Sequence, residues 1–204
     1  MKVELDQHVV RLVRPGVGRV MRRQQRSERR RLARLDRAAR ELASLHSLRA
    51  LLERAITVAE SGWVQGCWFS VTGEQGRPST VHARDIPAVT DKNVSGACLV
   101  GAIVAAGGGP TAVRTQPVQR ALDLTWHALH QSERQPVRWC PAPEIRMAHV
   151  RDLTRWNDHP QRSAHEVLTL LRTTLRLADA QTEMVRAEQA ATSSALGRGS
   201  GYPG

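Results

Sequence analysis

The stretch LARLDRAARELASLHSLRALLERAITVAES, residues 32–61, decides the fold. Its apolar residues recur every three or four positions, which is the period of one face of an α-helix. Ser61 and Gly62 end the pattern, since glycine is a common helix terminator. The spacing predicts one long helix with a single buried stripe, formed by Leu32, Leu35, Ala39, Leu42, Leu45, Leu48, Leu52, Ile56 and Ala59.

The same stripe could be buried in two ways. Apolar residues at this spacing over several turns also suit a two-stranded coiled coil, so residues 32–59 could join two copies of the chain. Arg34, Arg37 and Arg49 interrupt or flank a strict heptad pattern. We therefore favour packing against the protein's own core, while a homo-oligomer through this helix stays open.

Downstream, an irregular insertion is expected before the remaining helices. Residues 63–96 are rich in Gly, Pro, Ser, Thr and Asp, and residues 68–71 and 80–82 could pair there as a short β-hairpin. A last helix is predicted after Ser163 and Glu166, whose spacing is that of a capping box. The pattern indicates three more helices, over residues 95–106, 116–131 and 144–156.

The predicted fold class is mainly α: a small helical domain with a short β-hairpin or irregular insertion, preceded by a long basic helix. We divide the chain into a basic arm over residues 1–46, a helical domain over 47–188 and a tail over 189–204. The tail is expected to be disordered because it lacks apolar periodicity.

Positive charge is concentrated in the arm. Residues 1–46 hold 13 Lys and Arg against 5 Asp and Glu, a net +8, while the remaining residues add only +3 to reach the total of +11. Lys2 and Lys92 are the only lysines. Nearly all of the positive charge is therefore carried by guanidinium groups, which can grip a phosphate through two parallel hydrogen bonds.

Residues 17–31, VGRVMRRQQRSERRR, have almost no apolar face, so they can be helical only if continuous with the following helix or neutralised by a partner. If the chain from Arg11 to Arg40 is helical, its twelve arginines would project on nearly every side, which suits contact with DNA phosphates more than readout of bases. The alternatives are a solvated helix whose arginine excess reflects codon bias, and an anionic membrane surface or acidic protein as partner. The candidate nucleic-acid-binding residues are Arg19, Arg22, Arg23, Arg26, Arg29, Arg30, Arg31 and Arg34.

Cysteine usage and hydropathy favour a cytoplasmic protein. Cys67, Cys98 and Cys140 are an odd number at wide spacing, which indicates neither a disulfide scaffold nor a cysteine-rich zinc site. The most apolar run, residues 97–106, is about half of the ~20 residues that a membrane-spanning helix needs.

Three short motifs carry a family resemblance over about residues 48–178. The chain resembles a family of actinobacterial and phage proteins of unknown function in a Gly-Trp-x-Gln-Gly turn, a Cys-x-x-Gly-Ala segment, and a Trp-Asn-Asp-x-Pro segment that leads into Glu-Val-Leu. The matching positions are Gly62, Trp63, Gln65, Gly66, Cys98, Gly101, Ala102, Trp156, Asn157, Asp158, Pro160, Glu166, Val167 and Leu168.

The resemblance implies a fold but no activity. The chain departs from the family at residues 74–78, where an acidic loop is replaced, and at residues 160–162, which lack the usual glycine. Occurrence of the family on phages and mobile elements implies, by analogy, a place in mobile-DNA biology.

Gln65, Asn157 and Asp158 are a possible functional polar cluster. Asn and Asp between two helices more often form turns and caps, which is the interpretation that we favour. His127 and His130 lie three residues apart on a predicted helix, but their spacing matches no zinc signature. Apolar neighbours of Cys98 predict a raised thiol pKa and an unreactive side chain.

We therefore expect no cofactor, no metal and no catalytic residue. The leading hypothesis is a non-enzymatic accessory protein of an actinobacterial plasmid or phage, which binds DNA non-specifically through its arm and acts in transfer, maintenance or regulation. The alternatives are a small enzyme with a site near Gln65, Asn157 and Asp158, and a protein–protein interaction module.

Overall fold

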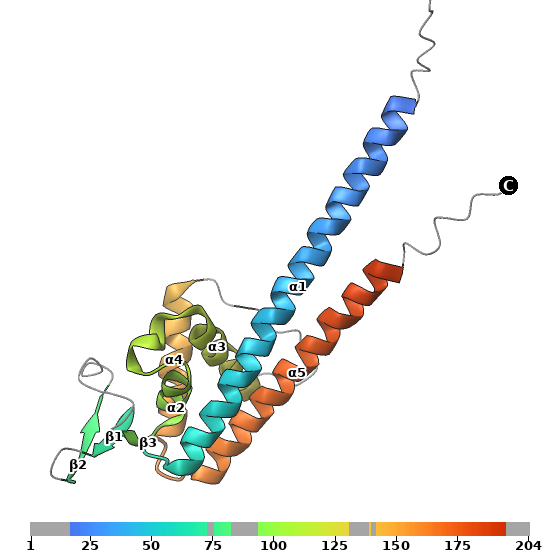
Figure 1. Cartoon of the computed structure of the whole chain (residues 1–204). Coiled ribbons are helices and arrows are strands. Elements are labelled where there is room, and N and C mark those ends of the chain that lie inside the picture. The colour runs from blue at the N-terminus through green and yellow to red at the C-terminus, as the bar shows by residue number, and fades with distance from the viewer. Residues whose placement is uncertain (1–16, 73–75, 83–93, 131–138, 140–141, 195–204) are drawn as a thin grey trace, which may run out of the picture.

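Two long helices, α1 (Val17–Ser61) and α5 (Ala164–Ser194), lie side by side and carry the shorter helices and the strands on one flank (Figure 1). The computed structural model describes residues 17–72, 76–82, 94–130, 139 and 142–194. The two helices are antiparallel, because Arg172 pairs with Glu60 at 2.8 Å near one end and Arg31 donates to the Thr192 carbonyl at 3.2 Å near the other. The chain is mainly helical, which confirms the predicted fold class.

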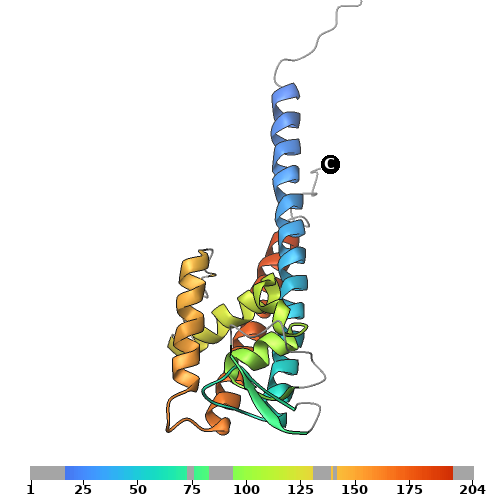
Figure 2. The same ribbon diagram turned by 90° about the vertical axis from the view of Figure 1, so that its left-hand side faces the viewer.

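The buried stripe of α1 starts later than the sequence predicts. Leu45, Leu48, Leu52 and Ala59 are buried in the core, so the helix packs within its own chain as we favoured. Leu32 is 55% exposed and Ala39 is also exposed, which corrects the predicted start of the stripe. The reason is that Leu32 and Ala39 lie on the side of α1 opposite the face that holds Leu45 and Leu48. Farther toward its start, α1 also extends beyond the compact part of the molecule (Figure 2).

In the described part of the chain, three shorter helices and one 3-10 turn complete the helical body. They are α2 (Leu99–Ala106), η3 (Pro110–Arg114), α3 (Gln116–His130) and α4 (Pro143–Asn157), and the predicted helices over 116–131 and 144–156 are confirmed. Helix α2 is the centre of the core, since all of its residues except Ala105 are buried. It ends before Gly107, and Gly108 and Gly109 follow with φ angles of 113° and 90°.

The insertion forms a small antiparallel sheet in the order β2-β1-β3. Its strands are β1 (Phe69–Thr72), β2 (Pro78–Val81) and β3 (Val94–Ala97). The predicted hairpin is confirmed, with Phe69 opposite Val81. Phe69 is fully buried and anchors the sheet to the helices.

The predicted helix over 95–106 is wrong in its first turn, because residues 94–97 form strand β3. Ala97 pairs with Phe69 of β1, and Ala97 N donates to the Gly62 carbonyl at 2.8 Å. Small side chains permit this approach, since a Cβ on Gly96 would meet the Gly62 carbonyl oxygen at 3.2 Å. Helix α2 then begins after Cys98, whose Sγ accepts a hydrogen bond from Gly101 N.

Helix α5 begins as predicted and ends later. The capping box forms as expected, because Glu166 Oε2 accepts from Ser163 N at 2.9 Å and Ser163 Oγ accepts from Glu166 N at 3.3 Å. The helix continues to Ser194, so residues 189–194 of the predicted disordered tail are helical. Contact with α1 near Arg31 supports these last turns. The rest of the tail, residues 195–204, lies outside the described residues.

None of the helices in the described part of the chain could span a bilayer.

Candidate functional site

The first part of α1 stands clear of the rest of the molecule. Every residue from Met21 to Arg30 is exposed, and Arg31 is the first to meet α5, through its bond to Thr192. Figures 1 and 2 both show α1 reaching past the end of α5. At 1.5 Å per residue, residues 17–30 make a projection about 20 Å long. We call residues 17–30 the projecting segment.

This segment is helical because it continues a packed helix. A helix is costly to start and inexpensive to extend, and Arg and Gln are good helix formers. The sequence expectation of a continuous helix is thus confirmed. Charge is nevertheless left unbalanced, because residues 17–40 contain ten arginines and only two acids, Glu28 and Asp36.

The candidate arginines all lie on α1, but not around its whole circumference. The side chains of Arg22, Arg23, Arg26, Arg29, Arg30 and Arg34 are exposed, Arg31 is half-buried, and the side chain of Arg19 lies outside the described part of the structure. Met21, Gln25, Glu28 and Leu32 follow one another at helical spacing and form a side without arginine. Within the described part of α1 the arginines therefore leave one side clear, while Arg11 and Arg14, which the expectation also included, lie outside the described residues.

Arginines continue the face of α1 that is buried in the core. Counting back from Leu45 in steps of three or four residues passes Glu41, Arg37, Arg34, Arg30, Ser27 and Arg23 in turn. Residues spaced in this way share one face of a helix. The inward face of α1 is therefore apolar where the body covers it and cationic beyond the body.

An ion pair marks the edge of the body on this face. Arg120 of α3 is 8% exposed, and its Nη2 lies 2.5 Å from Glu41 Oε1. The same guanidinium lies over the ring of Trp139, 4.1 Å from its centroid. Glu41 thus neutralises Arg120, and it offers little compensation to the arginines farther out.

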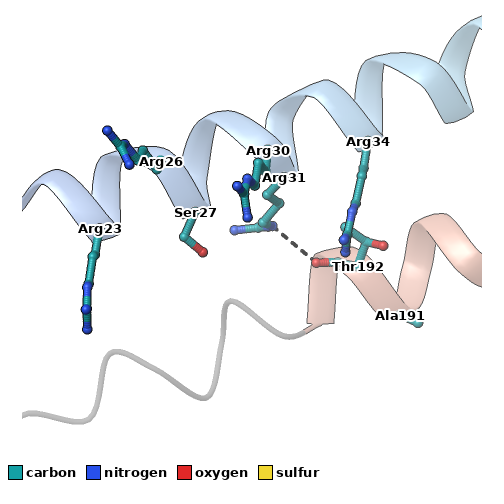
Figure 3. Close-up of a pocket in the computed structure, with 8 residues that line it drawn as sticks. All are labelled: Arg23, Arg26, Ser27, Arg30, Arg31, Arg34, Ala191 and Thr192. Atoms are coloured by element: carbon teal, nitrogen blue, oxygen red, sulfur yellow. Dashed lines mark hydrogen bonds between the residues drawn. The ribbon is translucent and has the colours of Figure 1, made fainter.

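The arginines form a notch where α5 ends beside α1. The notch has a volume of about 670 Å³ and is lined by Arg23, Arg26, Ser27, Arg30, Arg31, Arg34, Ala191 and Thr192. Figure 3 shows Arg23, Ser27 and Arg34 extending from α1 toward the side on which α5 ends, and Arg26 turned away from it. No acidic residue is among the lining residues that the structure describes. We refer to this hollow as the arginine notch.

The polar cluster expected at Gln65, Asn157 and Asp158 does assemble, at the opposite end of the molecule from the notch. Asn157 is fully buried at the end of α4, and its Oδ1 accepts from Trp63 Nε1 at 2.9 Å and from Leu99 N at 3.0 Å. Gln65 Nε2 donates to the carbonyls of Asn157 and His159.

Asp158 completes the cluster as a turn residue. Its Oδ1 accepts from Gly66 N at 3.0 Å and from Asn157 Nδ2 at 2.8 Å. Gly66 has a φ of 73°, which glycine adopts without strain. The amides of Gln65 and Asn157 are thus bonded within the protein. The partners of Asn157 and Asp158 include groups 58 to 94 residues away in the chain, so these bonds join separate elements, whereas the turn-and-cap interpretation invokes nearby backbone.

A second buried polar group, between α3 and α4, has no counterpart among the sequence motifs. Asp123 is 1% exposed and faces His149 Nδ1 at 3.1 Å and Arg146 Nε at 3.4 Å. The His149 ring stacks on Trp126 with centroids 4.0 Å apart. His127 and His130 also lie against Trp126, so the predicted histidine pair belongs to an aromatic group.

The described residues hold no gathering of three or more His, Cys, Asp or Glu side chains that could bind a metal ion. Cys98 is 1% exposed, and burial raises its thiol pKa to about 12. The predicted effect of its apolar surroundings is confirmed, because a thiol with such a pKa is not a nucleophile at neutral pH.

Comparison with known proteins places the body of the molecule in one family. A family model described as a family of unknown function (DUF6197) matches residues 43–177. No curated protein and no solved structure matches the chain. The matched range includes the core half of α1, the sheet and the polar cluster, and it excludes the projecting segment and the last turns of α5.

Proposed function

The chain belongs to the DUF6197 family, whose function is unknown, and on the geometry of α1 we propose that it binds nucleic acid through phosphate contacts of its projecting arginines. The observation that carries this proposal is a cationic helix that stands free of the body, with every residue from Met21 to Arg30 exposed. Guanidinium groups in such numbers attract a polyanion and release its bound counterions.

Duplex DNA is the partner that the segment suits best. A helix with its side chains is about 10–12 Å across, close to the ~12 Å width of the major groove of B-form DNA. The described part of the segment carries no aromatic residue on which unpaired bases could stack, which disfavours single strands. Binding is expected to be non-specific, since phosphates carry no sequence information.

A salt titration tests this function. Binding of the full chain to a duplex should weaken steeply with salt, with a slope of about 0.9 per phosphate contact in a log–log plot. Replacing Arg22, Arg26 and Arg29 together by Gln should lower that slope by about 2 to 3 units. The matched control replaces Arg77, Arg151 and Arg155, which are exposed on the body, and removes the same total charge.

The two triple variants separate local contact from overall charge. Equal losses in both would show that net charge alone attracts DNA and would refute a role for α1. Binding of anionic vesicles but not of duplex would favour the membrane alternative. Variants are preferable to removal of residues 1–46, because that cut would take away Glu41 and the buried Leu45.

We extend the proposal to the biological role. The family resemblance of the three motifs supports an accessory protein of an actinobacterial plasmid or phage, cytoplasmic and non-enzymatic, in DNA transfer, maintenance or regulation. Internal bonding of Gln65 and Asn157 supports a structural rather than a catalytic polar cluster. The neighbouring genes test this role, because a setting among metabolic genes alone would contradict it.

A further inference from the structure

The arginine notch concentrates positive charge that none of its described lining residues balances. Among the residues that the structure describes, five arginines of α1 line it, together with Ala191 and Thr192 of α5. Like charges held together repel, and the repulsion is relieved when a multiply charged anion enters. The Thr192 carbonyl at the end of α5 already accepts a bond from Arg31. Arg23, Arg30 and Arg34 are left to face the hollow.

We infer that the arginine notch seats one phosphate group of the nucleic-acid backbone, an inference that rests on the function proposed above. Guanidinium groups suit this ligand because they donate two parallel hydrogen bonds to phosphate oxygens. Ser27 adds a hydroxyl on the same side of α1 (Figure 3). The volume of about 670 Å³ leaves room for the sugars on either side of the phosphate.

The notch differs from the rest of the segment because two helices build it. Arg31 is fixed by its bond to Thr192, so this wall of the notch is formed before any ligand arrives. A site formed in advance loses less side-chain freedom on binding than arginines on an isolated helix. The phosphate in the notch therefore binds more tightly than phosphates along the projection, and it fixes where the duplex lies on α1.

Substitutions that preserve charge test the inference. Arg30→Lys keeps the positive charge but loses the planar guanidinium group that can donate two parallel hydrogen bonds to a phosphate. Ser27→Ala removes a hydroxyl without any change of charge. Each should weaken duplex binding about tenfold at constant salt, as expected for one lost charge-assisted hydrogen bond. The readout is the dissociation constant of the full chain for a fluorescent duplex, measured by anisotropy.

Matched controls come from the same helix. Arg40→Lys and Ser47→Ala change exposed residues of α1 outside the notch and should bind as the unaltered chain does. Alanine is a better helix former than serine, so weaker binding by Ser27→Ala cannot come from a lost helix. Far-UV circular dichroism verifies that helix content is equal.

The outcomes separate the inference from the proposed function. If the unaltered chain binds duplex and Arg30→Lys and Ser27→Ala bind equally well, the phosphate seat is overturned and the proposed function stands. If the unaltered chain binds no duplex, both fail. Inorganic pyrophosphate distinguishes a free anion from a backbone phosphate: it should displace duplex only at concentrations far above that of the duplex phosphates. Displacement at equal concentration would assign the notch to a free anion instead.

Discussion

Replacing Asn157, the last residue of α4, by alanine should destabilise the fold severely. Its side chain is fully buried and accepts from Leu99 N at 3.0 Å and Trp63 Nε1 at 2.9 Å. Its Nδ2 donates to the Val64 carbonyl at 3.2 Å. One amide thus ties together the loop after α1, the start of α2 and the end of α4.

The magnitude follows from the groups left without partners. Leu99 is fully buried, so its N–H cannot turn to water when Asn157 Oδ1 is removed, and each such group costs about 1–3 kcal/mol. With the half-buried Trp63 and Val64 also losing a partner, we expect a loss of about 2–5 kcal/mol, a large part of the roughly 5–15 kcal/mol that stabilises a typical domain.

Urea unfolding followed by circular dichroism measures this loss. The control is Asp158→Asn, which keeps an oxygen acceptor for Gly66 N and should cost less than about 1 kcal/mol. If Asn157→Ala unfolds within about 1 kcal/mol of the unaltered chain, the cluster does not hold these elements together and the structural interpretation is refuted.

Asn157→Asp tests the same cluster through the pH dependence of the free energy of unfolding. The new carboxyl would place an oxygen where Nδ2 now lies, 2.8 Å from Asp158 Oδ1. Burial and a like charge both raise the pKa of a carboxyl above its unfolded value. The folded state of this variant therefore binds more protons, and its stability should increase as the pH falls from neutral toward the ordinary range of an aspartate. A pH-independent deficit would contradict this account.

Two further predictions concern α2. Gly101→Ala should destabilise the protein by about 1–3 kcal/mol in thermal unfolding, because overpacking strains a core and the added Cβ would meet the Trp68 carbonyl oxygen at 2.1 Å. A gain in stability, which the higher helix propensity of alanine alone would give, is the opposing result. Cys98, with its thiol pKa raised to about 12 by burial, should resist iodoacetamide in the native protein and react once the chain is unfolded in urea at alkaline pH. Mass spectrometry of the peptide that contains Cys98 measures the extent of labelling. Rapid labelling of the native protein would show that the Cys98 thiol is accessible to the reagent and would contradict this prediction.

Local patterns made the helices predictable. Apolar spacing predicts α3 and α4 closely, and the Ser163–Glu166 pair identifies the start of α5. Strand β3 could not be predicted in this way, because Val94–Ala97 becomes a strand only through pairing with β1, about 25 residues earlier. The end of α5 was missed for a similar reason, since its last turns lie against α1.

Parts of the candidate sites could likewise be predicted from the sequence, whereas other parts depend on how the helices pack. Composition alone identifies the arginines of α1, and the sequence motifs alone suffice to group Gln65, Asn157 and Asp158. The notch could not be predicted, because it depends on where α5 ends along α1. Asp123 and His149 come from different helices, and no spacing in the sequence brings them together.

Continuity between the buried and cationic parts of one helical face limits how α1 can vary. One inserted or deleted residue between Leu45 and Arg34 would turn everything upstream by about 100° and carry the arginines away from α5. Two residues would turn it twice as far, whereas seven would restore the face to within about 20°. Relatives that share the notch should therefore change the length of α1 between these residues only in steps that restore the face, such as seven residues.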